Sequence, residues 1–185
     1  MTLKNRKSTR LKNYDYSTTG AYFLTICTKH RKNILSKIYV GTDFHDCPKI
    51  ELSKFGNVAD KYINQLNKFY DNISLDNYVI MPNHIHLLIS INNDGQSRTP
   101  VPTNTKMPSV TTNSERTPTS INQNINSIIA SFVSTFKRFC NKEFNINIWQ
   151  NRYYDHIIRC EEDYNEIWKY IDNNPFNWQE DELYN

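Results

Sequence analysis

The stretch from residue 76 to residue 91, DNYVIMPNHIHLLISI, constrains the fold more than any other part of the chain. It is too long and too apolar for one simple strand, and Pro82 cannot donate a hydrogen bond within a central ladder. We therefore expect two antiparallel strands joined tightly at Pro82 and Asn83. Because side chains alternate along a strand, His84 and His86 would share one face of the second strand, and Ile85, Leu87 and Ile89 would share the other.

The remaining elements follow from composition and apolar periodicity. Residues 21–28 and 153–159 are typical of strands, whereas apolar residues recur at helical intervals from 55 to 70 and from 125 to 140. We expect a last helix at 163–174, because Pro175 ends it. The order strand, helix, strand, strand, helix, strand, helix predicts an α+β protein. Its plan is the ferredoxin-like, or RRM-like, split βαβ antiparallel sheet with an added C-terminal helix.

Residues 92–124 differ in character from the rest of the chain. They contain four apolar residues and four prolines among many threonines, serines and asparagines. Such a segment cannot bury enough apolar surface to offset its ordering entropy, so we expect a disordered insertion. A chain of 185 residues is long enough for one core and short for two. We therefore expect a single domain over 1–185 that carries this insertion.

Charge is distributed unevenly along the chain. The formal net charge is +3, but residues 161–185 carry eight acidic side chains and one basic side chain, which leaves +10 on residues 1–160. The arm at 1–14 holds five basic residues and no acidic one: Lys4, Arg6, Lys7, Arg10 and Lys12. A basic body with a basic arm favours a polyanionic partner, although a merely solvated surface has the same composition.

Targeting and cysteine usage point to the cytoplasm. No apolar run approaches the roughly 20 residues of a membrane helix, and no signal-peptide core follows the basic arm. The four cysteines, at positions 27, 47, 140 and 160, form no C-x-x-C pair. We interpret them as reduced and mostly buried thiols, and we expect neither a membrane partner nor a zinc site.

The two histidines can serve as ligands of one divalent metal ion. Alternate residues of a strand lie about 7 Å apart at the backbone, so that their side chains can converge. Two ordinary buried histidines have the same pattern, and in a bare H-x-H they are the more frequent case. The histidine-triad nucleotide hydrolases need a third histidine, and Leu88 stands at that place.

Three blocks of sequence carry a more specific resemblance. MPNHIHLLI, WQNRYYDHIIR and YNEIWKYIDNNPFNW resemble the signature blocks of the REP-associated tyrosine transposases, an insertion-sequence 200-like branch of the HUH single-tyrosine nucleases. The resemblance covers nearly the whole chain apart from 92–124. It implies the ferredoxin-like fold, with the nucleophile on the added helix, and DNA transposition. In that chemistry, single-stranded DNA is cleaved and rejoined beside a hairpin through a 5′-phosphotyrosine.

The same resemblance assigns residues to roles. It implies that His84 and His86 bind Mg²⁺ or Mn²⁺, that Tyr170 is the nucleophile and that Asn174 is a third ligand. Helical periodicity agrees for Tyr170, which lies at the edge of the apolar stripe of its helix. The predicted partner is single-stranded DNA with a REP-like or inverted-repeat hairpin, bound by a monomer or a homodimer.

Further candidates have weaker support. Lys137, Arg138 and Arg159 are candidate phosphate contacts, as are Arg6, Lys7 and Arg10 in the arm. His156 either supports the metal ligands, contacts DNA or packs inside the protein. Trp149 and Trp178 can stack on unpaired bases, but core packing is the favoured interpretation. Two alternative functions remain: a catalytically inactive nucleic-acid-binding module of the same fold, and an HUH replication initiator.

Overall fold

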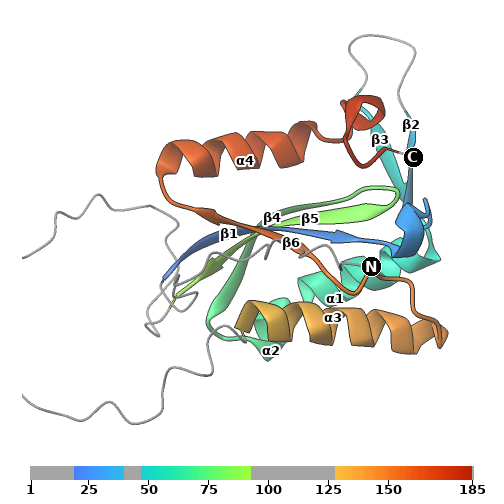
Figure 1. The fold of residues 1–185 in the computed structure, drawn as a ribbon, viewed down its shortest axis with the longest axis horizontal. Coiled ribbons are helices and arrows are strands. Elements are labelled where there is room, and N and C mark those ends of the chain that lie inside the picture. The colour runs from blue at the N-terminus through green and yellow to red at the C-terminus, as the bar shows by residue number, and fades with distance from the viewer. Residues whose placement is uncertain (1–18, 40–46, 93–127, 185) are drawn as a thin grey trace, which may run out of the picture.

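The computed structural model describes residues 19–39, 47–92 and 128–184. The predicted basic arm at 1–14 and the predicted insertion at 92–124, apart from Asn92, lie outside the described residues. In Figure 1, a central sheet is covered by helices on both faces. Within the described ranges, none of the helices combines the length and the apolar character needed to cross a bilayer.

The central sheet has four antiparallel strands in the order β4-β5-β1-β6. Their bounds are Gly20–Cys27 for β1, Ile73–Ile80 for β4, His84–Ile91 for β5 and Tyr154–Ile158 for β6. The predicted hairpin is confirmed, because Ile80 pairs with Ile85 across a tight connection at residues 81–83. The α+β class is confirmed as well, and the strand order is the one that a split βαβ plan requires.

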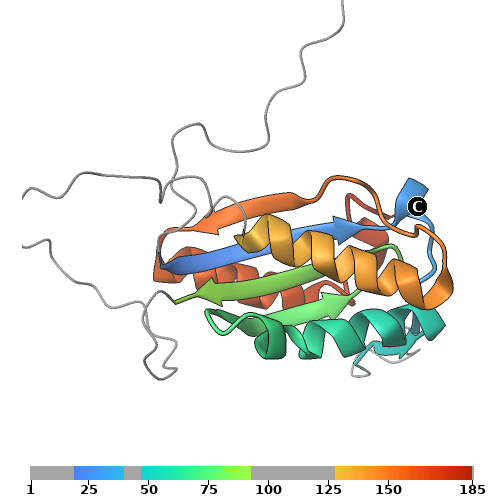
Figure 2. The ribbon, with the colours of Figure 1, turned by 90° about the horizontal axis from the view of Figure 1, so that it is seen from below.

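Two helices cover one face of this sheet and a third covers the other. α1 (Lys54–Asn64) and α3 (Ile128–Phe144) lie below the sheet in Figure 1, whereas α4 (Glu161–Asn173) lies above it. Figure 2, seen from below, shows α1 and α3 side by side in front of the sheet. The larger apolar core fills the space between the sheet and the α1–α3 layer, and it includes Leu24, Leu87 and Phe136. Full burial of one such side chain contributes about 1.5–3 kcal/mol to folding.

Local signals define where α1 starts. Ser53 is its N-cap, and the Ser53 hydroxyl accepts hydrogen bonds from the backbone N–H groups of Phe55 and Gly56. Gly56 is required by close packing, since a Cβ atom there would lie 2.1 Å from the Leu35 carbonyl oxygen. The helix predicted over 55–70 breaks at Gln65, after which α2 (Leu66–Phe69) forms a separate turn.

Two short elements and two exposures differ from expectation. β2 (Ser36–Tyr39) and β3 (Lys49–Leu52) pair as a small second sheet, which was not predicted because each has only four residues and partly exposed side chains. Two single-turn 3₁₀ helices, Lys29–Arg31 and Trp178–Glu180, were also missed. The cysteines are unpaired as expected, but the prediction that they are mostly buried was wrong: Cys140 is buried, Cys27 is half-buried, and Cys47 and Cys160 are exposed.

Candidate metal centre and tyrosine site

The candidate site lies between β5 and α4. The alternation predicted for β5 is confirmed: Ile85, Leu87 and Ile89 belong to the core under α1 and α3. The two imidazoles share the α4 face with Leu88. His84 is 0% exposed and His86 is 2% exposed. Across the sheet, Cys27 pairs with His84 and Thr25 pairs with His86. The pairing of β5 with β1, the other inner strand, therefore places both histidines at the centre of the sheet.

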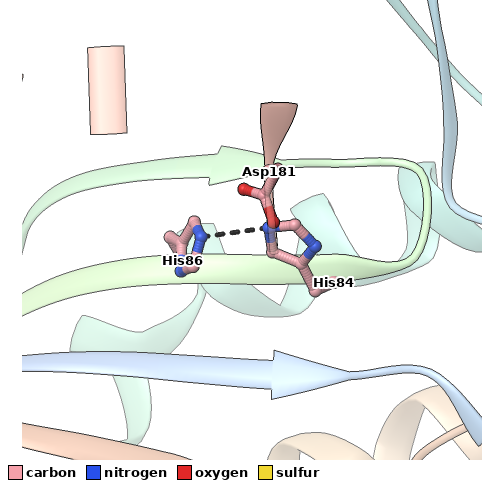
Figure 3. Close-up of side chains that lie close together, drawn as sticks. All are labelled: His84, His86 and Asp181. Carbon is pink, nitrogen blue, oxygen red and sulfur yellow. Dashed lines mark hydrogen bonds between the residues drawn. The ribbon is translucent and has the colours of Figure 1, made fainter. Parts of the chain in front are cut away.

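The two imidazoles present converging nitrogen atoms. The Nε2 atoms of His84 and His86 lie 3.0 Å apart. A dashed line joins the two atoms in Figure 3. Adjacent ligand atoms of an octahedral site, each about 2.1 Å from the ion, are separated by about 3.0 Å. The pair is thus spaced as two neighbouring ligands of one ion.

Neighbouring polar groups orient both rings. The Asn83 Nδ2 amide donates to the Leu183 carbonyl at 2.7 Å, which turns its Oδ1 atom toward His84 Nδ1 at 2.8 Å. Because an amide oxygen only accepts, His84 carries its proton on Nδ1 and has a lone pair on Nε2. The Thr25 hydroxyl lies 3.0 Å from His86 Nδ1 and can accept in the same way. Such partners fix the tautomer of a ligating histidine.

Burial keeps both imidazoles neutral at neutral pH. It lowers the pKa of His84 to about 4, against a smaller opposing effect of the Asp181 carboxylate. Burial also lowers the pKa of His86 well below its ordinary value, and the neighbouring His84 lowers it further. A neutral imidazole is the form that binds a metal ion.

Asp181 and Asn174 complete the cluster. The ligand atoms of Asp181, His84 and His86 all lie within 4.8 Å of one another, and Figure 3 shows the carboxylate directed toward His84. Asn174, just beyond α4, donates from Nδ2 to the Asp181 carboxylate at 2.9 Å. Its Oδ1 atom is buried and has no hydrogen-bond partner among the described residues.

This donor set fits a divalent cation. Two imidazole nitrogens, one carboxylate oxygen and one buried amide oxygen in need of a partner suit Mn²⁺, and Mg²⁺ also favours the oxygen donors. Sequence reasoning predicted Asn174 and missed Asp181. No periodic signal could have identified Asp181, because it follows Pro175 in an irregular segment and lies within an acidic run that resembles a solvated surface.

Tyr170 approaches the histidines from α4. Its hydroxyl lies 3.4 Å from His86 Nε2, and its ring contacts His86 and Phe23 edge to face at 5.3 and 5.9 Å between centroids. The side chain is 46% exposed, although its helix buries Ile171 one position later. Burial raises the pKa of the Tyr170 phenol, and the Asp181 carboxylate raises it further.

Tyr170 lines a cleft of about 1000 Å³. The end of α4 and the segment after it line this cleft. Four Phe and Tyr side chains line it as well: Phe23, Tyr153, Tyr154 and Tyr170. A substrate in the cleft would thus reach both Tyr170 and His86.

The segment after α4 is attached to the site. Leu183 donates its N–H to the Asp181 carboxylate at 2.6 Å, while its carbonyl accepts from Asn83. Trp178 is buried and lies against His84, with 5.9 Å between ring centroids. Trp149 is also buried, so the prediction of core packing is confirmed for both tryptophans.

The other predicted residues lie outside this cluster. His156 pairs with Asp163 at 3.0 Å and so joins β6 to the first turn of α4. The Lys137 ammonium donates to the carbonyls of residues 150, 151 and 152, so that its three protons are directed to the protein's own backbone. Arg138 and Arg159 are exposed. Arg6, Lys7 and Arg10 lie outside the described residues.

Fold and site together define a class: an antiparallel α+β sheet with an HUH-like histidine pair beneath a helix that presents a tyrosine. No protein-family model matches the sequence. A Haemophilus influenzae protein, described as uncharacterized, is 32% identical over 186 residues that cover 98% of this chain and 94% of that protein. The chain belongs to the same family as this protein.

A solved structure shares the fold. A REP-associated tyrosine transposase bound to a REP hairpin superimposes with a TM-score of 0.53 and 16% identity, over 91% of this chain and 74% of that chain. The resemblance inferred from the sequence blocks is thereby confirmed as a structural similarity. At this identity, the likeness establishes the fold, and the chemistry has to be argued from the site.

Proposed function

We propose that the protein is a metal-dependent transposase that cleaves and rejoins single-stranded DNA next to hairpins through a 5′-phosphotyrosine intermediate. The observation that carries the proposal is the approach of the Tyr170 hydroxyl to within 3.4 Å of His86 Nε2, beside the convergent Nε2 atom of His84. A nucleophile from one layer of the fold thus meets a metal-ligand pair from the other. The hairpin bound to the structurally similar transposase supports this class of substrate.

Four side chains would hold the cation: His84, His86, Asp181 and Asn174. When bound, Mg²⁺ or Mn²⁺ would polarise a non-bridging oxygen of the scissile phosphate and stabilise the charge that develops there. Asn83 and Thr25 keep the Nε2 lone pairs directed at this position. Asn174 would coordinate the ion through Oδ1, while its Nδ2 group donates a hydrogen bond to Asp181 and so orients that carboxylate.

Tyr170 would perform the covalent step. Its phenol oxygen forms a bond to the phosphorus atom as the bond from phosphorus to the 3′ oxygen breaks, which leaves a 5′-phosphotyrosine and a 3′ hydroxyl. The raised pKa keeps the phenol protonated at neutral pH, so its proton has to leave during the attack. Attack of a 3′ hydroxyl on the phosphotyrosine reverses the step and rejoins a strand without ATP.

The fold disfavours the inactive binding module as an alternative. An RRM-like module binds RNA on an open sheet face with stacked aromatic residues. Here α4 covers the face that carries His84 and His86 (Figure 1). No described residue gives particular support to a replication initiator.

Covalent trapping on DNA tests the proposal. The protein is incubated with a labelled hairpin-tailed single strand and Mn²⁺, with chelator in a parallel reaction, and is analysed on a denaturing gel. The wild type should form a denaturation-resistant adduct, and Tyr170→Phe should lose it, because phenylalanine keeps the ring but has no oxygen to attack phosphorus.

Tyr164→Phe is the matched control, since Tyr164 lies on the same helix and bonds to Asp76 away from the histidines. This variant should keep the adduct. Peptide mapping that places the DNA on Tyr153 or Tyr154 would transfer the nucleophile to the strand and overturn the assignment of Tyr170.

A further inference from the structure

A second hollow lies outside the metal site, on the α1–α3 side of the molecule. It is a groove of about 800 Å³ between α3, from Ala130 to Lys142, and residues 145–153. Three basic residues line it, Lys137, Arg138 and Lys142, and none of the described residues that line it is acidic. We call it the α3 groove.

The acid next to Lys142 in sequence offsets only part of the positive charge of the α3 groove, because it interacts more strongly with α1 than with Lys142. Glu143 follows Lys142 in α3, but its carboxylate accepts hydrogen bonds from Lys61 at 2.9 Å and from Tyr62 at 2.6 Å on α1. Lys137 is engaged with backbone carbonyls, whereas Arg138 and Lys142 are exposed at the rim. Two cationic groups are therefore presented to solvent on one edge of the groove.

The catalytic cleft has the opposite charge balance. Four acidic residues line it against two basic ones, and these are Glu166, Glu180, Asp181 and Glu182 against Arg152 and Lys169. A polyanion gains little electrostatic attraction from such a surface, and phosphate contacts supply most of the affinity of DNA-binding proteins. Affinity for DNA must then come from another surface.

The two hollows also differ in their aromatic content. Unpaired bases stack on aromatic rings, and the cleft offers Tyr154 and Tyr170, which are 53% and 46% exposed. In the α3 groove, Trp149 is only 1% exposed and Tyr153 is half-buried. Like the cleft, the groove also carries carboxamides, which can donate to phosphate oxygens: Asn141, Asn145, Asn147, Gln150 and Asn151.

The cleft and the α3 groove are contiguous, because Gln150 and Tyr153 line both. We propose that the α3 groove binds the phosphate backbone of the paired hairpin stem while the cleft receives the unpaired strand. This inference rests on the proposed function, and it divides the substrate between a basic surface without exposed rings and an acidic surface with them.

Binding without cleavage tests this division. Arg138→Gln/Lys142→Gln and the wild type are titrated, in chelator, against a blunt hairpin without a tail and against an unpaired oligonucleotide, by fluorescence anisotropy at several salt concentrations. Loss of two phosphate contacts should weaken hairpin binding roughly 10-fold and lower the salt slope by about 2, at about 0.9 per phosphate of duplex DNA. Binding of the unpaired oligonucleotide should stay within about twofold.

Lys68→Gln is the control, because Lys68 lies in α2 and does not line the α3 groove. α2 lies next to the N-terminal part of α3, where Tyr70 contacts Phe132. This variant should change neither titration. An unchanged hairpin affinity and salt slope in the double variant would overturn the proposal. Equal losses for hairpin and unpaired strand would overturn it too, as would stronger binding of an RNA hairpin that depends on the same two residues. If the Tyr170 adduct still forms in those cases, only the role of the groove fails.

Discussion

At residues 84–87 of β5, the two faces of the central sheet are equally buried, but only the α4 face carries polar side chains. On β5, Ile85 and Leu87 are 0% exposed beneath α1 and α3, while His84 and His86 are 0% and 2% exposed beneath α4. Burial therefore does not distinguish core from candidate site in this protein. What distinguishes them is the supply of polar partners, because a buried polar group needs a hydrogen bond or an ion to offset its lost hydration.

The helical layers on the two faces differ accordingly. α3 buries five residues, whereas α4 buries only Ile171. α4 is held in addition by polar contacts at its ends, from His156 to Asp163 at 3.0 Å and from Asn77 to Asp172 at 2.9 Å. A layer with few apolar contacts opens at lower free energy than the rest of a fold. This suits a helix that would have to admit DNA to the face beneath it.

The largest expected effect lies on the α4 face. His84→Ala or His86→Ala should reduce DNA cleavage at least about 100-fold, because either change removes a metal ligand. Hairpin binding in chelator should change by no more than about threefold, since phosphate contacts supply most of the affinity. Cleavage on a denaturing gel and anisotropy measure the two effects. A variant that cuts at the wild-type rate contradicts the metal assignment.

At Leu87, the residue after His86 in β5, a substitution should affect stability rather than DNA cleavage. Leu87→Ala should lower the free energy of unfolding by about 2–5 kcal/mol, the usual effect of a cavity in a packed core. Cleavage per folded molecule should remain near that of the wild type. Urea denaturation, with activity scaled to the folded fraction, measures both. A specific loss of activity in Leu87→Ala would show that the two faces are not independent.

A smaller effect should identify the oxygen ligands. Asp181→Asn and Asn174→Ala should each weaken Mn²⁺ binding by about 10- to 100-fold in titration calorimetry, because each removes or neutralises an oxygen donor of the cluster. Glu182→Gln is the control, since its carboxylate is not part of the cluster. If Asp181→Asn binds Mn²⁺ as the wild type does and Asn174→Ala does not, the third ligand is Asn174 alone.

The most gradual effect is a pH dependence of stability in chelator. Burial lowers the pKa of His84 to about 4 and that of His86 well below 6.5, so the unfolded chain takes up protons before the folded one as pH falls. The stabilisation is fully present above the ordinary pKa of 6.5 and should decline by about 1.4 kcal/mol per pH unit for each imidazole below it.

Urea denaturation across this range measures the slope. For His84 the decline should end near its folded-state pKa of about 4. A profile in which the wild type and His84→Ala have equal slopes between pH 6.5 and 4 would contradict the contribution of His84.

The sequence by itself determined the sheet, its hairpin and the face of each β5 residue. Alternation has a period of two, so the break at Pro82 and Asn83 fixes which side chains of β5 are paired with which helices. The helical periods placed Tyr170 at the edge of the α4 stripe in the same way. These patterns are local, because each depends only on residues that are close together in the sequence.

Only the tertiary structure decided which polar groups meet. Asp181 reaches the histidines because the chain reverses after Pro175, and it is held there by Asn174 and by the backbone of Leu183, contacts that no sequence period encodes. Lys137 was predicted from the sequence to contact phosphate, yet its ammonium group donates to three backbone carbonyls. Hydrogen-bond partners far apart in sequence are chosen by packing, because the free energy of a buried polar group depends on what lies beside it in space.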